Sequence, residues 1–184
     1  MPYGDIKDFS SVLASIVTAL ATLAGVLIAN HFNIRTTKLN IESQLWQKSN
    51  DRKIEKLEQI YLLFERWYHT VSSVYMTHYR CHRGHLEYSQ VQELMKQQKV
   101  PEPGEAQKYK VLMDIHFSSL NRAHARVELA RKNLVPFLGD PKKKQLAVSD
   151  FDARMDEFEE ACSAFKSAIS EAAKETTVSQ RMPH

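Results

Sequence analysis

The chain has 184 residues, of which 43% are hydrophobic and 26% charged, a composition that excludes an intrinsically disordered protein. A net charge of +3 argues against a nucleic-acid-binding protein, and two cysteines are too few for a disulfide framework. The chain has few glycines and prolines and no alternating Val/Ile/Thr-rich run after residue 35, which predicts an all-α fold.

The first predicted element is an apolar helix at residues 9–32. No Asp, Glu, Lys or Arg occurs between Asp8 and Arg35, and about 20 helical residues cross a hydrocarbon core. The run is too long, and its start too acidic, for a cleaved secretory signal. We therefore predict an integral membrane span, with a buried core helix as the alternative.

Basic residues are distributed unequally across this span. Lys7 precedes it, and five basic residues follow it within about twenty positions. These five are Arg35, Lys38, Lys48, Arg52 and Lys53. The bias predicts a single-pass protein of the bacterial inner membrane, with residues 1–8 as an external tail and the main part in the cytoplasm. Reduced Cys81 and Cys162 agree with that compartment.

Small residues of the span recur at alternating steps of four and three, which places them on one stripe of a helix. They are Ser11, Ser15, Thr18, Thr22, Gly25 and Ala29. Small residues allow helices to approach closely in lipid, so the stripe predicts a homo-oligomer that associates through the span. The alternative is an ordinary span whose hydroxyls bond back to their own helix.

Helix is expected to continue from Asn33 toward Lys99, because no break is signalled before Gly84, and the sequence leaves continuity at Gly84 open. Residues 33–53 carry only a thin apolar seam and are interpreted as a stalk that can pair with a second copy. The seam consists of Ile34, Ile41 and Leu45. A denser stripe then predicts a core helix. It consists of Ile54, Leu57, Tyr61, Phe64, Tyr68, Val71 and Tyr75.

Two more helices are expected, at Glu105–Leu134 and from Ser149, where Ser149 and Asp152 resemble a capping box. The last helix has the cleanest apolar stripe in the chain, formed by Phe151, Met155, Phe158, Cys162, Phe165, Ile169 and Ala172. The sequence thus predicts an antiparallel three-helix bundle or coiled coil over residues 54–175, followed by a flexible tail at 176–184.

Charge is divided between the last two predicted helices. Residues 108–144 hold nine Lys/Arg against three Asp/Glu, whereas 149–175 hold eight Asp/Glu against three Lys/Arg. We expect ion pairs between the helices to set their register while the apolar stripes supply most of the stability. The expected partners are Arg122, Arg126, Arg131 and Lys132 on one side and Asp152, Asp156, Glu159 and Glu160 on the other.

The segment HYRCHRGHLEY, residues 78–88, is the one candidate for site chemistry. Its imidazoles and thiol, His78, Cys81, His82 and His85, are residue types that bind zinc. Neither a CxxC pair nor an HExxH motif accompanies them. We therefore predict no metal and no cofactor, and interpret the cluster as the polar end of an apolar stripe.

Arg80 and His85 in this segment form an R-x4-H pattern that resembles the motif of HEPN-type ribonucleases. These are all-helical proteins in which an arginine and a histidine from two protomers line a shared cleft. The resemblance covers six residues, and Cys81 replaces the polar residue usual after the arginine. It implies a membrane-tethered ribonuclease as an alternative function, with Arg80 and His85 as its catalytic residues.

The short tail, the span and the helix opening KIEKLEQIYLLFERW are similar to single-span bacterial and phage membrane proteins, some of which belong to phage exclusion or defence systems. No phosphate-binding loop or GxSxG motif indicates an enzyme. We expect a non-enzymatic scaffold that self-associates in the membrane and binds a cytosolic protein. A membrane-disrupting or channel-forming oligomer is the first alternative, ahead of the ribonuclease.

Overall fold

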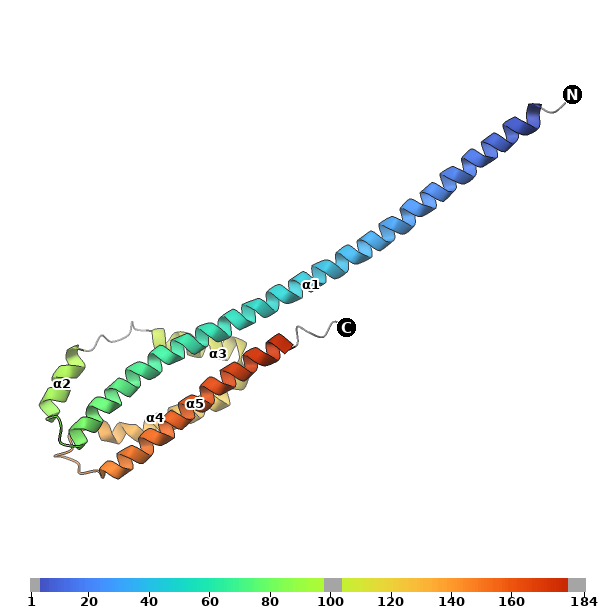
Figure 1. The fold of residues 1–184 in the computed structure, drawn as a ribbon. Helices are drawn as coiled ribbons and strands as arrows, with labels where there is room; N and C mark the ends of the chain where they lie inside the picture. Colours follow the sequence, from blue (N-terminus) through green and yellow to red (C-terminus); the bar gives the residue numbers. More distant parts are fainter. Residues whose placement is uncertain (1–3, 98–103, 179–184) are drawn as a thin grey trace. The chain divides into compact units, whose positions relative to one another are not determined.

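The computed structural model describes residues 4–97 and 104–178, with the side chains of residues 4–12, 105, 106 and 178 outside the description. All regular elements in these ranges are helical, which confirms the all-α fold class (Figure 1). The chain divides into two compact units, Met1–Ser49 and Asn50–His184. Helix α1, Gly4–His82, supplies residues to both.

Helix α1 ends at His82, seventeen residues before Lys99, so the helix is not continuous at Gly84, a point that the sequence left open. Gly84 has φ +74°, a left-handed conformation that a residue with a Cβ rarely adopts. The His85 N–H donates to the Arg80 carbonyl at 2.9 Å and the Gly84 N–H to the Cys81 carbonyl at 3.0 Å. These two bonds form a Schellman motif, which terminates the helix.

A separate helix, α2, Tyr88–Gln97, follows the turn. The Gln90 side chain accepts a hydrogen bond from the Glu87 N–H at 2.9 Å, which is half of a capping box. Val91 is completely buried and fixes this short helix to the second unit. The interruption at residues 83–87 therefore both stops α1 and starts α2.

The expected helix at residues 105–134 is two helices, α3, Glu105–His116, and α4, Asn121–Leu134, joined by the 3-10 turn η1, Ser118–Leu120. Phe117 leaves the helical region with φ −143° and ψ 57°. The serines and asparagine that follow it compete for backbone hydrogen bonds and favour turns. The single-helix prediction is wrong because this local polar stretch reverses the chain.

Helix α5, Val148–Val178, follows the short helix η2, Val135–Leu138. It begins one residue before Ser149, and the Ala147 carbonyl accepts its first helical bond from the Phe151 N–H at 3.3 Å. Ser149 thus lies inside the first turn, which corrects the capping prediction. Phe137 stacks on Phe151, so α4 and α5 are antiparallel as expected.

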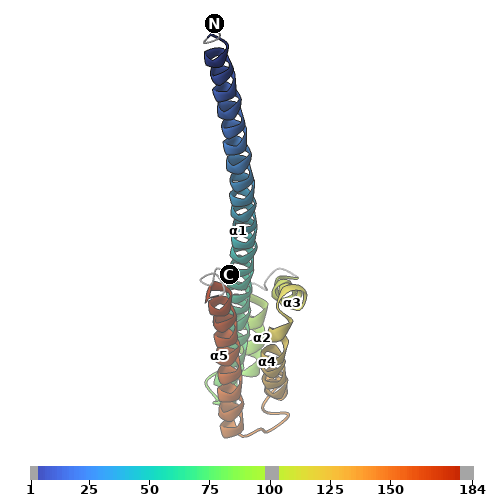
Figure 2. The same cartoon turned by 90° about the vertical axis from the view of Figure 1, so that its right-hand side faces the viewer.

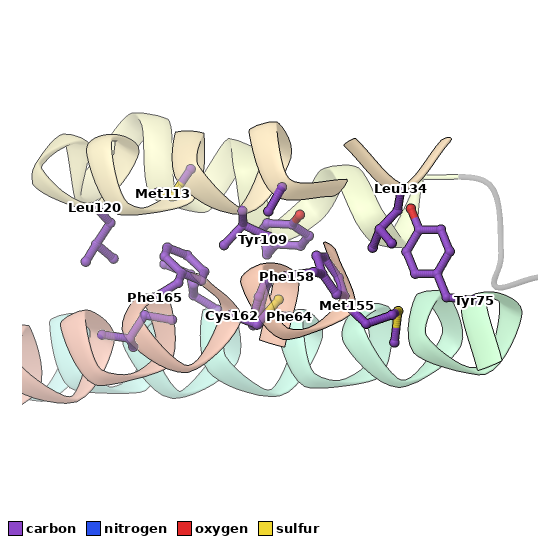
Figure 3. Close-up of a cluster of buried hydrophobic side chains, with 14 of the residues drawn as sticks. Phe64, Tyr75, Tyr109, Met113, Leu120, Leu134, Met155, Phe158, Cys162 and Phe165 are labelled. Carbon is purple, nitrogen blue, oxygen red and sulfur yellow. The ribbon is translucent and has the colours of Figure 1, made fainter. Parts of the chain in front are cut away.

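The core of the second unit is formed by α1, α3, α4 and α5 (Figure 2). Figure 3 shows Tyr109 and Met113 of α3 facing Phe158 and Phe165 of α5. Phe64 of α1 lies 4.7 Å from Phe165, ring centre to ring centre. Burying an aromatic side chain of this size contributes roughly 1.5–3 kcal/mol, so this aromatic layer is a main source of stability.

The ion pairs expected between α4 and α5 are not among those of the described residues. Arg131 binds Glu128 of its own helix at 3.0 Å, and Asp152 lies 4.0 Å from Arg83, which directly follows α1. Arg122 and Glu160 are exposed. The contact between α4 and α5 is instead made by the aromatic stripe and by a side-chain hydrogen bond between Asn133 and Glu157.

Candidate functional site

The apolar segment of α1 in the first unit is uncovered by the rest of the chain. Among the described residues, α1 is the one helix that is long and apolar enough to cross a membrane. None of the most apolar stretch of this helix is buried. Leu20, Leu27 and Phe32 are each about 60% exposed. A buried core helix would bury such side chains, so this segment is a possible membrane span.

The predicted stripe of small residues has open space at Gly25. A Cβ built on Gly25 would meet no atom within 4 Å. Thr22 donates its hydroxyl to the Thr18 carbonyl, and Thr18 to the Ala14 carbonyl, both at 2.8 Å. These hydroxyls are satisfied within the helix, as in the alternative interpretation, while the stripe keeps its smooth surface. The Ser11 side chain lies outside the described residues.

The four candidate metal ligands near the end of α1 have different surroundings. His78 is buried, its Nδ1 has no hydrogen-bond partner, and burial followed by the neighbouring His82 lowers its pKa. His82 binds the Phe137 carbonyl through Nε2 at 3.0 Å. Cys81 is buried with a raised thiol pKa, and His85 is exposed.

This arrangement favours packing over coordination. No group of three or more His, Cys, Asp or Glu side chains is placed to hold a metal ion within the part of the chain that the structure describes. His82 also packs edge-on against Phe151 at 5.3 Å. Its ring is thereby held by an aromatic contact and a backbone carbonyl, which are the surroundings of a structural histidine.

Arg80 and His85, the pair resembling a ribonuclease motif, flank the Schellman turn. Both side chains are exposed, and their connection is the backbone bond from His85 to Arg80. The two grooves described on this unit are lined by residues of α1 and α5 other than this pair.

A polar cluster inside the second unit was missed by sequence reasoning. The Tyr109 hydroxyl lies 3.1 Å from Nε2 of His124, and both residues are buried. Glu128 comes within 3.8 Å of the same nitrogen. His124 and Glu128 are one helical turn apart, a spacing visible in the sequence, but Tyr109 joins them only because the chain reverses at Phe117.

Two basic groups complete this cluster. Lys110 binds Glu128 at 2.7 Å, and Arg131 binds its other oxygen through two nitrogens. Burial raises the carboxyl pKa, but these hydrogen bonds outweigh it, and the pKa of Glu128 is lowered overall. Burial, then Lys110, lowers the pKa of His124. Every charge has a partner, so the cluster ties α3 to α4 and indicates no reactive group.

A shallow apolar groove of about 320 Å³ lies between α1 and α5 in the second unit. Its lining residues are Leu57, Glu58, Tyr61, Leu62, Ile169, Ser170 and Ala173. Leu62 is 60% exposed at its edge. An apolar side chain from another protein would fit such a groove, whereas a substrate would find few polar groups to orient it.

Comparison with protein-family models, curated proteins and solved structures gives no match to this chain. Function must therefore be inferred from the surfaces described above. These are the exposed apolar helix of the first unit and the apolar groove and polar cluster of the second unit.

Proposed function

We propose that the chain is a single-span membrane protein, amino terminus outside, that self-associates through its span and presents a cytosolic helical unit to a protein partner. It acts as a scaffold without chemistry of its own. The resemblance to single-span bacterial and phage proteins assigns it, within this proposal, to a phage defence or exclusion system.

The observation that carries the proposal is the uncovered apolar segment of α1. Its large side chains are exposed, and their transfer from water to lipid is favourable by about 25 cal/mol per Å². One stripe of this segment contains only small residues, so a second helix can pack there more closely than lipid chains can. The same segment thus supports both the anchor and the self-association.

The test enlarges one small residue on the stripe and one beside it. Gly25→Leu should weaken self-association several-fold, because helix contact in lipid depends on close approach. Nothing within 4 Å in the same chain would clash with the new side chain. Insertion should be unchanged, since Leu is favourable in the membrane. A membrane two-hybrid assay and carbonate extraction measure the two properties.

Ala24→Leu is the matched control, because it adds a comparable side chain one position away from the stripe. It should associate like the wild-type protein. Equal association of the wild-type, Gly25→Leu and Ala24→Leu proteins would remove the self-association part of the proposal. Release of the wild-type protein by carbonate would remove the membrane part.

A further inference from the structure

Most buried residues of α1 in the second unit follow a heptad register, with Tyr75 as the exception. Leu57, Phe64 and His78 are buried and fall at intervals of seven or fourteen, and Ile60 occupies the second position of the same register. The next positions of the register are Trp67, Val71 and Val74, and all three are partly buried. These are the a and d positions of a helix that packs along its length against neighbours.

Counted back in sevens along the sequence, this register reaches the span without interruption. Its positions are Ser11, Ser15, Thr18, Thr22, Gly25, Ala29, Phe32, Thr36, Leu39, Ser43, Trp46 and Asn50. The first six are the small-residue stripe. All twelve are uncharged, and the first charged residue of the register is Lys53. An uncharged stripe of this length is what a water-excluding helix contact requires.

Large apolar residues occupy this stripe beyond the span. Phe32, Leu39 and Trp46 are 61%, 58% and 42% exposed. At about 1.5 Å per residue, Leu39 and Trp46 lie roughly 10 and 21 Å along the helix from Phe32. The headgroup region accounts for an aromatic residue at the membrane surface, as at Phe32, but not for apolar residues so much farther along the helix.

The seam considered first, through Ile34, Ile41 and Leu45, is a poorer contact. Lys38 and Lys48 lie in line with it, so covering it would bury two ammonium groups. The uncharged stripe has no such cost between Ser11 and Asn50. Its e positions are the amides Asn33, Asn40 and Gln47, which cannot repel a charge on a parallel partner.

We propose that the contact between copies continues out of the membrane as a parallel coiled coil through Trp46. This inference rests on the proposed self-association and extends it. Copies inserted in one membrane with one orientation are parallel, so Phe32, Leu39 and Trp46 meet their own counterparts. Thr36 and Ser43 form the narrow layers between them.

Disulfide scanning of the full chain in membranes tests the register. Thr36→Cys should cross-link between copies several-fold more than Thr37→Cys, and Ser43→Cys more than Gln44→Cys, because only the stripe positions bring Cβ atoms close enough for a disulfide. These pairs are matched in residue class, and all four side chains are exposed within the chain. Cys81 and Cys162 are buried, so the wild-type protein gives the background.

Cross-linking that peaks at Thr36 and Ser43 supports the proposal. A peak at Lys38, Ile41 and Leu45, or equal cross-linking at every position, overturns it. No cross-linking in the stalk while Ala29→Cys cross-links within the span overturns the extension but leaves the proposed self-association standing. If Ala29→Cys also fails, both proposals are wrong.

Discussion

His124 is the residue whose charge state bears most directly on the stability of the second unit. His124 is 6% exposed, and its Nε2 lies 3.1 Å from the hydroxyl of Tyr109, whose raised pKa keeps the phenol protonated. The pKa of His124 is lowered by burial and by Lys110, and that of His78 by burial and by His82. Both rings are therefore neutral in the folded protein at neutral pH.

We predict that the free energy of unfolding falls as the pH decreases from about 7.5 to 5.5. Below about pH 6.5 the unfolded chain protonates these histidines while the folded chain resists, and each unit of pKa difference corresponds to about 1.4 kcal/mol. Stability from the lowered pKa values is thus present above pH 6.5 and is lost below it. Urea titrations of the detergent-solubilised protein measure the effect.

A Trp46→Phe background isolates the signal of Trp67, which contacts Phe64 and Tyr109 in the core. His78→Gln combined with His124→Gln should flatten the pH dependence while lowering stability at pH 7.5. Retention of the full pH dependence in this double variant would show that other groups cause it. The pKa of the Glu128 carboxyl is lowered, so its protonation occurs below the pH range of this experiment and does not contribute to the measured change.

The sequence predicted which residues of one helix are buried, but it did not predict which residues of different helices contact each other. The stripe from Phe151 to Ile169 is buried as predicted, because its periodicity is a local property. The bond between Tyr109 and His124 joins residues fifteen apart, about 22 Å along a straight helix. It forms only because α3 folds back on α4, which no periodicity indicates.

The helix boundaries of the second unit depend on a few backbone positions. Gly84 has φ +74° and ends α1 through the Schellman bonds, whereas Gly139 has φ −84° at the end of η2. A Cβ at Gly84 would meet no atom within 4 Å, and one at Gly139 only the Pro136 carbonyl oxygen at 4.0 Å. Any difference between the two positions is therefore conformational.

Gly84→Ala should lower the free energy of unfolding by about 1–2 kcal/mol, because an L-residue is disfavoured in the left-handed region. Gly139→Ala should be neutral or stabilise by up to about 1 kcal/mol, since it restricts the unfolded chain without strain. Urea titration at pH 7.5 compares the two. An equal loss in both variants would contradict a special role for the Gly84 conformation.

Element type was predicted correctly, and element ends were often wrong. Gly84 is the first break signal after the apolar segment, but the sequence left continuity through it open, because an isolated glycine costs a helix only about 1 kcal/mol. The turn at Phe117 has no glycine or proline at all. Serine side chains compete for backbone hydrogen bonds and so favour a turn over a helix. Tertiary contacts such as Tyr109–His124 then stabilise this turn.

The two units place opposite demands on their surroundings. In the second, aromatic side chains from four helices bury one another, and the Glu128 carboxylate binds Lys110 and Arg131. In the first, the large apolar side chains of α1 remain exposed within the chain. The heptad register that links them was missed because span, stalk and core were counted separately. The burial of Leu57 and Phe64 shows which residues occupy the a positions of this register.

Orientation in the membrane is the prediction that belongs to the molecule as a whole. Lys and Arg near the ends of a span are retained on the cytoplasmic side, and one such residue precedes this span while five follow within about twenty positions. A reporter fused after Ser179 should therefore be active only if it works in the cytoplasm, and one fused before Met1 only if it works outside.

Replacing Arg35 and Lys38 by Gln while adding two Lys beside Lys7 should invert a fraction of the molecules. The same two additions without the Gln replacements are the control and should invert fewer. A carboxy-terminal reporter active only in the external compartment of the wild-type protein would reverse the orientation and would also place Cys81 and Cys162 in an oxidising compartment.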